Sequence, residues 1–108
     1  MSQITIEDFK KIDLRVAKIL DVQEIPGVDR LWKLEIDLGS EKKSIVAGVK
    51  KFYTAEQLRG KSIVVINNLV PSVIRGVESN GMLLAAKDES GLTLITVDKD
   101  IPAGSAIG

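Results

Sequence analysis

Hydrophobic and polar residues alternate along the first half of the chain in the way that half-buried strands require. From Trp32 to Leu38 every second residue is apolar, and the residues between are charged. The segment Leu14–Ile25 shows the same period of two but is interrupted at Lys18, which predicts a long strand with a bulge or bend between residues 17 and 19. A shorter strand is expected over Ser44–Ala47. This half of the chain therefore predicts an antiparallel sheet with one buried face.

Apolar runs in the second half predict further strands around an unusual loop. The expected strands are Ser62–Asn67, Met82–Ala86 and Leu92–Val97, with a hairpin turn between the last two. The stretch between the first two strands contains a proline, two glycines, an arginine and several amide and hydroxyl groups. Proline lacks a donor and glycine permits positive φ, so we predict a loop here. Because functional groups are often presented on loops held by a rigid sheet, we interpret it as the working edge of the protein.

Two short helices are expected outside the strands. The segment Ile4–Ile12 begins with a capping box made by Thr5 and Asp8, and Thr54 with Gln57 forms the same motif before Leu58. The first helix is too short to be stable without packing. It can dock on its own domain or on a second subunit, and the pattern leaves both open.

The order of these elements predicts an all-β fold. Three strands, a short helix and further strands match the OB-fold, a five-stranded Greek-key barrel in which a helix joins strands 3 and 4. Small SH3-like barrels and other β-sandwiches fit the same pattern. We expect one domain over residues 1–108, with residues 1–12 as a helical N-terminal extension and residues 98–108 as a packed C-terminal tail.

Composition excludes several functional classes. The chain has no cysteine and no histidine, which removes thiolate nucleophiles, histidine-based triads and the usual zinc or iron ligand sets. It also has no P-loop and no glycine-rich dinucleotide fingerprint. We therefore expect no enzyme, cofactor or metal. No signal peptide and no membrane-spanning run are visible, which favours a soluble, cytoplasmic protein without a membrane partner.

Charge is distributed unevenly along a chain whose net charge is zero. Residues 42–75 contain seven basic residues and one acid, a local charge of +6, and the segments before and after carry −3 each. A local basic field can attract a phosphate backbone even when the whole protein is neutral. The alternative is that these lysines are simply solvated on loop faces.

The loop carries a recognisable motif. It reads Asn68-Leu69-x-Pro71-x-x-Ile74-Arg75-Gly76-Val77-x-Ser79-x-Gly81-Met82-Leu83-Leu84-Ala85-Ala86, which resembles the signature of the tRNA-binding domain family. The segments 26–39 and 45–61 look like the family's first hairpin and its third strand with the helix that follows. The family includes the C-terminal appendage of methionyl-tRNA synthetase, free-standing dimeric tRNA-binding proteins, auxiliary proteins of synthetase complexes and a chaperone-like branch.

The resemblance implies an OB-fold homodimer that binds tRNA by shape and assists methionyl-tRNA synthetase as a domain or a separate subunit. The opening methionine, with no linker before the domain, favours a free-standing protein. The alternative is a dimeric protein-binding or chaperone-like module with residual RNA affinity. Family members commonly carry basic residues where this chain has Val70 and Val73, so we expect weakened tRNA binding. The residues predicted to form the dimer interface are Ile4, Ile6, Phe9, Ile101, Pro102 and Ile107.

Arg75 is the first candidate for RNA contact, because a guanidinium can bind phosphate bidentately or stack on an unpaired base. Its alternative is an ion pair with Glu78 within the loop. The other predicted RNA-binding residues are Asn68, Ser79, Lys42, Lys43, Lys50, Lys51 and Met82. Asn68 and Ser79 could instead satisfy their own loop's backbone, and Met82 could belong to the core. The aromatic residues Trp32, Phe52 and Tyr53 fit a structural role better than base stacking.

Overall fold

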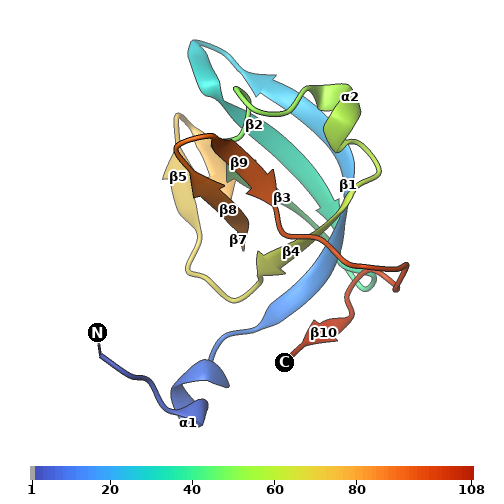
Figure 1. Cartoon of the computed structure of the whole chain (residues 1–108). Helices are drawn as coiled ribbons and strands as arrows, with labels where there is room; N and C mark the ends of the chain where they lie inside the picture. The colour runs from blue at the N-terminus through green and yellow to red at the C-terminus, as the bar shows by residue number, and fades with distance from the viewer. Residues whose placement is uncertain (1) are drawn as a thin grey trace.

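The computed structural model describes residues 2–108 and is built mainly from antiparallel strands (Figure 1). Its largest sheet follows the order β3-β2-β1-β4-β7, and β10 pairs with the beginning of β1. The strands of this sheet are β1 (Leu14–Ile25), β2 (Val28–Asp37), β3 (Lys42–Ala47), β4 (Ser62–Ile66), β7 (Met82–Leu83) and β10 (Ala106–Ile107). The prediction of an all-β protein is confirmed.

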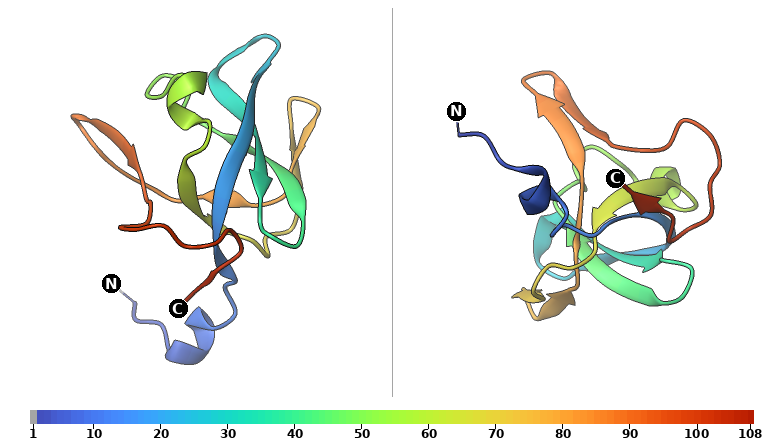
Figure 2. Two further views of the ribbon diagram at one scale, coloured as in Figure 1. Left: turned by 90° about the vertical axis from the view of Figure 1, so that its right-hand side faces the viewer. Right: turned by 90° about the horizontal axis from the view of Figure 1, so that it is seen from below.

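Two hairpins and two helical turns complete the described chain. The hairpins pair β5 (Ser72–Ile74) with β6 (Val77–Ser79), and β8 (Ala85–Asp88) with β9 (Gly91–Leu94). The helices are α1 (Ile6–Phe9) and α2 (Ala55–Leu58). Figure 1 and the left view of Figure 2 show α1 at one end of the molecule, outside the sheets. Neither helix is long and apolar enough to cross a membrane.

The core lies on one face of the large sheet, as the alternating pattern predicts. Every apolar residue from Trp32 to Leu38 is buried, and Leu34 and Ile36 are almost completely excluded from solvent. The charged residues between them lie on the opposite face. Other large residues of the core, from β1, β3, α2 and β4, are Ile19, Ile45, Leu58, Ile63 and Val65. Burial of these aliphatic side chains is the main force that stabilises the fold.

A bulge in β1 lies where the strand changes from pairing with β4 to pairing mainly with β2. The first half, from Leu14 to Lys18, pairs with β4, and the second half pairs with β2. The register shifts between Ile19 and Asp21, so that Leu20 is the extra residue and is 40% exposed. The sequence predicts this irregularity between residues 17 and 19, slightly too early. An extra residue increases the local twist and bends the strand, which is what this long strand needs.

The predicted bounds of several elements are wrong. The N-terminal helix covers only Ile6–Phe9 instead of Ile4–Ile12, although its predicted capping box at Thr5 is present. Strand β2 begins at Val28, before the alternating segment, and β3 begins at Lys42. The two strands pair continuously from Asp37–Lys42 to Trp32–Ala47. Backbone hydrogen bonds extend the ladder beyond the residues whose side chains are buried, and hydrophobic alternation does not report that extension.

The predicted strand Met82–Ala86 is divided into β7 and β8 at Leu84. Its backbone N–H donates to the carbonyl of Val64 at 2.9 Å, and its carbonyl accepts from the N–H of Ile95 at 3.0 Å. Leu84 is therefore the point at which the chain leaves the large sheet and enters the β8–β9 hairpin. The predicted strand Leu92–Val97 begins one residue earlier and ends at Leu94. A run of apolar residues does not reveal where a strand changes partners.

Candidate nucleic-acid interface

The segment between β4 and β7 contains a hairpin, where the sequence predicts only a loop. Ile74 pairs with Val77, which leaves Arg75 and Gly76 as a two-residue turn. Their φ angles are +52° and +80°. Positive φ at both central positions is the mark of a type I′ turn, whose twist matches that of the flanking strands. The motif is hard to read in the sequence because the first position usually holds asparagine, aspartate or glycine.

Arg75 lies at the tip of this hairpin. It is exposed, and within residues 2–108 neither Glu78 nor any other carboxylate forms an ion pair with it. A left-handed conformation costs a non-glycine residue about 1–2 kcal/mol. Positions held in such a conformation cluster at functional sites. The turn therefore presents a guanidinium that is available to a phosphate or another anion.

The end of the hairpin is anchored to β3 by side-chain and backbone contacts. The Ser79 hydroxyl accepts from the backbone N–H of Val46 at 2.9 Å and donates to the carbonyl of Gly81 at 3.2 Å. Ser79 is only 5% exposed. The N–H of Asn80 also donates to the carbonyl of Ser44 at 2.9 Å. Ser79, which the sequence predicts to contact RNA, is thus placed where it satisfies the protein's own backbone.

Gly81 follows at a crowded position. Its φ is +143°, and a Cβ there would lie 2.9 Å from the backbone carbonyl oxygen of Ile66. A side chain would therefore push the segment after the hairpin away from β4. This glycine allows the end of the hairpin to pass close to the large sheet.

The beginning of the hairpin segment is tied to the N-terminal region. The Asn68 side chain accepts from the N–H of Asp13 at 2.9 Å and donates to the carbonyl of Lys11 at 2.7 Å. The Asn67 amide donates to the Asp13 carboxylate at 3.0 Å. This hydrogen bond, together with that from Arg15 at 2.7 Å, holds the pKa of Asp13 below its usual value. Both polar ends of the Asn68 side chain are occupied by backbone, so Asn68 too is placed in a structural position.

Two of the predicted RNA-binding lysines are directed at the protein itself. The Lys43 ammonium donates to the carbonyls of Asn67 at 3.0 Å and Asn80 at 3.4 Å. The Lys50 ammonium lies 3.3 Å from the Glu24 carboxylate and 4.8 Å from the centre of the Trp32 ring. Each lysine side chain is only about one-fifth exposed. These contacts reduce the charge that either lysine can offer to a ligand.

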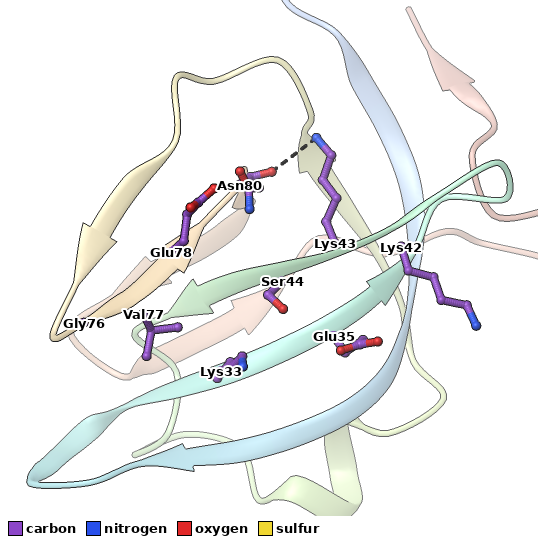
Figure 3. A pocket seen from close by; sticks show the side chains of 9 residues that line it. All are labelled: Lys33, Glu35, Lys42, Lys43, Ser44, Gly76, Val77, Glu78 and Asn80. Carbon is purple, nitrogen blue, oxygen red and sulfur yellow. Dashed lines mark hydrogen bonds between the residues drawn. The ribbon is translucent and has the colours of Figure 1, made fainter.

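A groove of about 490 Å³ lies between the outer face of β2–β3 and the hairpin (Figure 3). Its lining residues are Lys33, Glu35, Lys42, Lys43, Ser44, Gly76, Val77, Glu78 and Asn80. Lys42 is exposed, whereas Lys33 is partly buried. Sequence reasoning missed Lys33, although the alternation of β2 places it on the solvent face. The groove therefore combines two lysines without an ion-pair partner in residues 2–108 with two carboxylates.

The remaining candidates do not line this groove. Lys51 is exposed in the turn after β3, and Met82 is 46% exposed at the start of β7. Trp32 is buried, and its indole N–H donates to the carbonyl of Tyr53 at 2.9 Å, which agrees with a structural role. The exposed apolar residues of the hairpin segment are Leu69, Val70 and Val73.

The predicted dimer residues gather near the two ends of the chain. Helix α1 buries none of its residues, and Ile4 and Ile6 are 69% and 63% exposed. In the C-terminal tail Ile101 is 48% exposed, Pro102 is exposed, and Ile107 pairs with Leu14 in the sheet. Phe9 is partly buried. Figure 1 shows α1 and the C-terminus on the same side of the molecule.

The fold and the groove define a small antiparallel β-domain that presents lysines and a loop-borne arginine to solvent. Within the described residues, no group of three acidic, histidine or cysteine side chains could hold a metal ion. The sequence model of the family described as "Putative tRNA binding domain" matches residues 14–106. The chain belongs to this family.

Relatives at about 50% identity are longer proteins that the chain matches over part of their length. It is 50% identical to the methionine–tRNA ligase of Caldanaerobacter subterraneus over 104 residues, which are 96% of this chain and 16% of the relative. It is 51% identical to the methionine–tRNA ligase of Thermotoga maritima, again over 96% of this chain and 16% of the relative. The chain thus spans about one-sixth of the length of these ligases.

Two solved structures resemble it over their full length. The MetRS related protein from Pyrococcus horikoshii has a TM-score of 0.94 at 33% identity, with 100% of both chains covered. The chaperone CsaA from Bacillus anthracis has a TM-score of 0.89 at 28% identity, covering 99% of this chain and 100% of the other.

Proposed function

We propose that this chain binds tRNA through the groove and the tip of the β5–β6 hairpin, largely independently of base sequence. The observation that carries the proposal is Arg75, an exposed guanidinium held in a left-handed turn beside a groove that contains Lys33 and Lys42. Membership of the tRNA-binding domain family supplies the ligand class. Lysine and arginine contacts to phosphates fix position and affinity without reading sequence.

We also propose that the large sheet closes as an OB barrel. The sheet order β3-β2-β1-β4-β7 supports this, and so do the hydrogen bonds that join residues 79–80 to Val46 and Ser44 of β3. Those bonds link the segment before β7 to the opposite edge of the sheet. OB-folds bind oligonucleotides on the face of their second and third strands and on adjacent loops, which is where the groove lies.

The apolar positions of the hairpin segment set the expected affinity. Val70 and Val73 are 88% and 70% exposed and offer no charge to phosphate. Each phosphate contact that is missing lowers the salt dependence of binding by about 0.9 in the slope of log K against log salt. We therefore expect modest affinity that depends on few ionic contacts.

The biological setting that fits is assistance to methionyl-tRNA synthesis in the cytoplasm, as a domain of the synthetase or as a separate subunit. The relatives named methionine–tRNA ligase support this setting. We further propose a homodimer formed through the terminal segments. The exposed Ile4, Ile6 and Ile101 in the two terminal segments support it, because apolar side chains that the domain leaves in solvent can be buried in an interface between subunits. A dimer presents two RNA-binding surfaces, which raises the apparent affinity.

Binding of bulk tRNA over a series of salt concentrations tests the proposed function. Arg75→Ala should weaken binding several-fold at low salt and reduce the slope by about one. Lys87→Ala is the matched control, because Lys87 is exposed on β8 outside the groove. Circular dichroism would establish that both variants are folded. Equal losses in the two variants, or no binding by the wild type at low salt, would contradict the proposal.

A second candidate is a chaperone-like module that binds unfolded protein. The likeness to the chaperone CsaA and the exposed Val70 and Val73 favour it. In that case Val70→Ser with Val73→Ser should reduce suppression of client aggregation, whereas Arg75→Ala should leave it unchanged. If the two valine substitutions leave suppression of aggregation unchanged while Arg75→Ala weakens tRNA binding, tRNA remains the ligand.

The dimer is tested separately by sedimentation. Ile4→Ser with Ile6→Ser should convert the dimer to monomer, and Val70→Ser with Val73→Ser serves as a control of similar exposed apolar area elsewhere. A dimer that survives the first pair of substitutions would contradict a role for α1.

A further inference from the structure

Lys42 and Lys43 are adjacent in sequence but occupy different environments. The Lys42 side chain is exposed, and Figure 3 shows it directed away from the hairpin, whereas the Lys43 ammonium points to Asn80. The Lys43 side chain is 20% exposed, and the Glu41 carboxylate lies 3.8 Å from its ammonium. An ammonium has three donors and is costly to desolvate unless those donors are used. Lys43 uses two of them on backbone carbonyls.

The two carbonyls flank the hairpin segment. Asn67 directly follows β4, and Asn80 is separated from the first residue of β7 only by Gly81. Other contacts hold each side to a different neighbour: the Asn67 N–H donates to Asp13, and the Asn80 N–H donates to Ser44. Backbone pairing of Ile66 with Met82 joins β4 to β7, and the Lys43 ammonium joins Asn67 and Asn80, which lie just inside that pair. Lys43 is therefore a side-chain link between the two sides at the base of the segment.

The hairpin needs such support at its base. Strands β5 and β6 share only three residue pairs, and a two-stranded hairpin is marginally stable by itself in water. Its tip holds Arg75 in a left-handed conformation that the turn must maintain. Loss of support at the base should therefore increase the mobility of the tip.

We propose that Lys43 is a positioning residue, which clamps the base of the hairpin and thereby holds Arg75 in place, and that it does not contact phosphate. The binding part of this inference rests on the proposed function, whereas the clamp itself can be measured without RNA. The proposal replaces the sequence-based expectation that Lys43 is a phosphate contact equivalent to Lys42.

Hydrogen exchange of the free protein tests the clamp. Lys43→Met should accelerate exchange of the amides in residues 72–80 by about tenfold, because two partly buried carbonyls lose their donor. Exchange of the core amides of Leu34 and Ile63 should remain unchanged. Lys42→Met, which removes the same charge from the neighbouring residue, should leave hairpin exchange as in the wild type. Unchanged hairpin exchange in Lys43→Met would overturn the proposal whether or not the protein binds RNA.

Binding to bulk tRNA then separates positioning from contact. Arg75→Ala should cost less affinity in the Lys43→Met background than in the wild type, since the clamp acts through the hairpin tip. In the Lys42→Met background, Arg75→Ala should cost as much affinity for tRNA as it does in the wild type. Additive losses for Lys43 and Arg75 would identify Lys43 as an independent phosphate contact. If Lys43→Met fails to fold, Lys43→Gln offers a shorter, neutral donor and supports the same two measurements.

Discussion

Helices α1 and α2 begin with the same local motif but have different places in the molecule. Each is four residues long and starts with a threonine in a complete capping box, Thr5 with Asp8 and Thr54 with Gln57. In α2, Leu58 is completely buried in the core. In α1 no residue is buried, and Ile6 in its first turn and Ile4 before it are more than 60% exposed.

The contrast shows that a cap specifies where a helix begins but not what it packs against. A four-residue helix is too short to be stable alone, so its population depends on tertiary contacts. Contact with the core supplies them for α2. Residues that follow α1 make polar contacts with Asn68 through Lys11 and Asp13, and the apolar side chains of Ile4 and Ile6 stay exposed.

The largest effect on stability should come from Leu58, the residue of α2 that is buried in the core. Leu58→Ala should lower the free energy of unfolding by about 2–5 kcal/mol, since it opens a cavity in a closed core. The matched change Ile6→Ala in α1 should change it by less than about 0.5 kcal/mol in the monomer. Urea denaturation measures both. A large loss from Ile6→Ala at concentrations where the protein is monomeric would show that α1 packs on its own domain.

Removal of each N-cap should give a smaller difference in the free energy of unfolding. Thr54→Ala should cost about 1 kcal/mol, because the cap stabilises a helix that the core requires. Thr5→Ala should reduce the helicity of α1 but alter global unfolding by only a few tenths of a kcal/mol, because α1 can fray without exposing core. Urea midpoints and amide exchange at Lys10 and Arg59 distinguish the two outcomes. Equal costs would mean that the helices are equally integrated in the fold.

Acid should affect the attachment of α1 and leave that of α2 unchanged. The hydrogen bonds from Asn67 and Arg15 lower the pKa of Asp13 in the folded state. Their contribution is therefore fully present above the ordinary aspartate pKa and is lost as pH falls through the lowered value. NMR signals of the Asn67 side-chain amide should move over that range, and Asp13→Asn should abolish the movement. Signals that stay constant through the acid range would contradict this linkage.

Local patterns in the sequence predict a large part of this fold. The alternation around Leu34 identifies the core face of β2, and both capping boxes are found where the residues place them. Such features depend on residues two to four positions apart. The loop motif also identifies the segment that carries Arg75 and, through resemblance, the family to which the chain belongs.

The roles of individual polar residues in the candidate site depend on distant partners. Ser79 is buried against Val46, 33 residues away, and Asn68 binds the backbone of Lys11, 57 residues away. Lys42 and Lys43 are indistinguishable by type and position in the sequence. Which of them faces solvent follows from the alternation of β3 and from where the chain returns at Asn80.

The amino-acid pattern thus specifies a mostly β chain with two capped helices, a basic middle segment and a candidate functional loop, because short-range periodicity and turn chemistry depend on neighbouring residues. It does not specify that the loop forms a hairpin with a type I′ turn or that Lys43 binds the backbone at its base. Nor does it specify that α1 buries none of its residues. Those features arise when strands far apart in the chain pair in one register. Burial and hydrogen bonding then assign chemically similar residues to different roles.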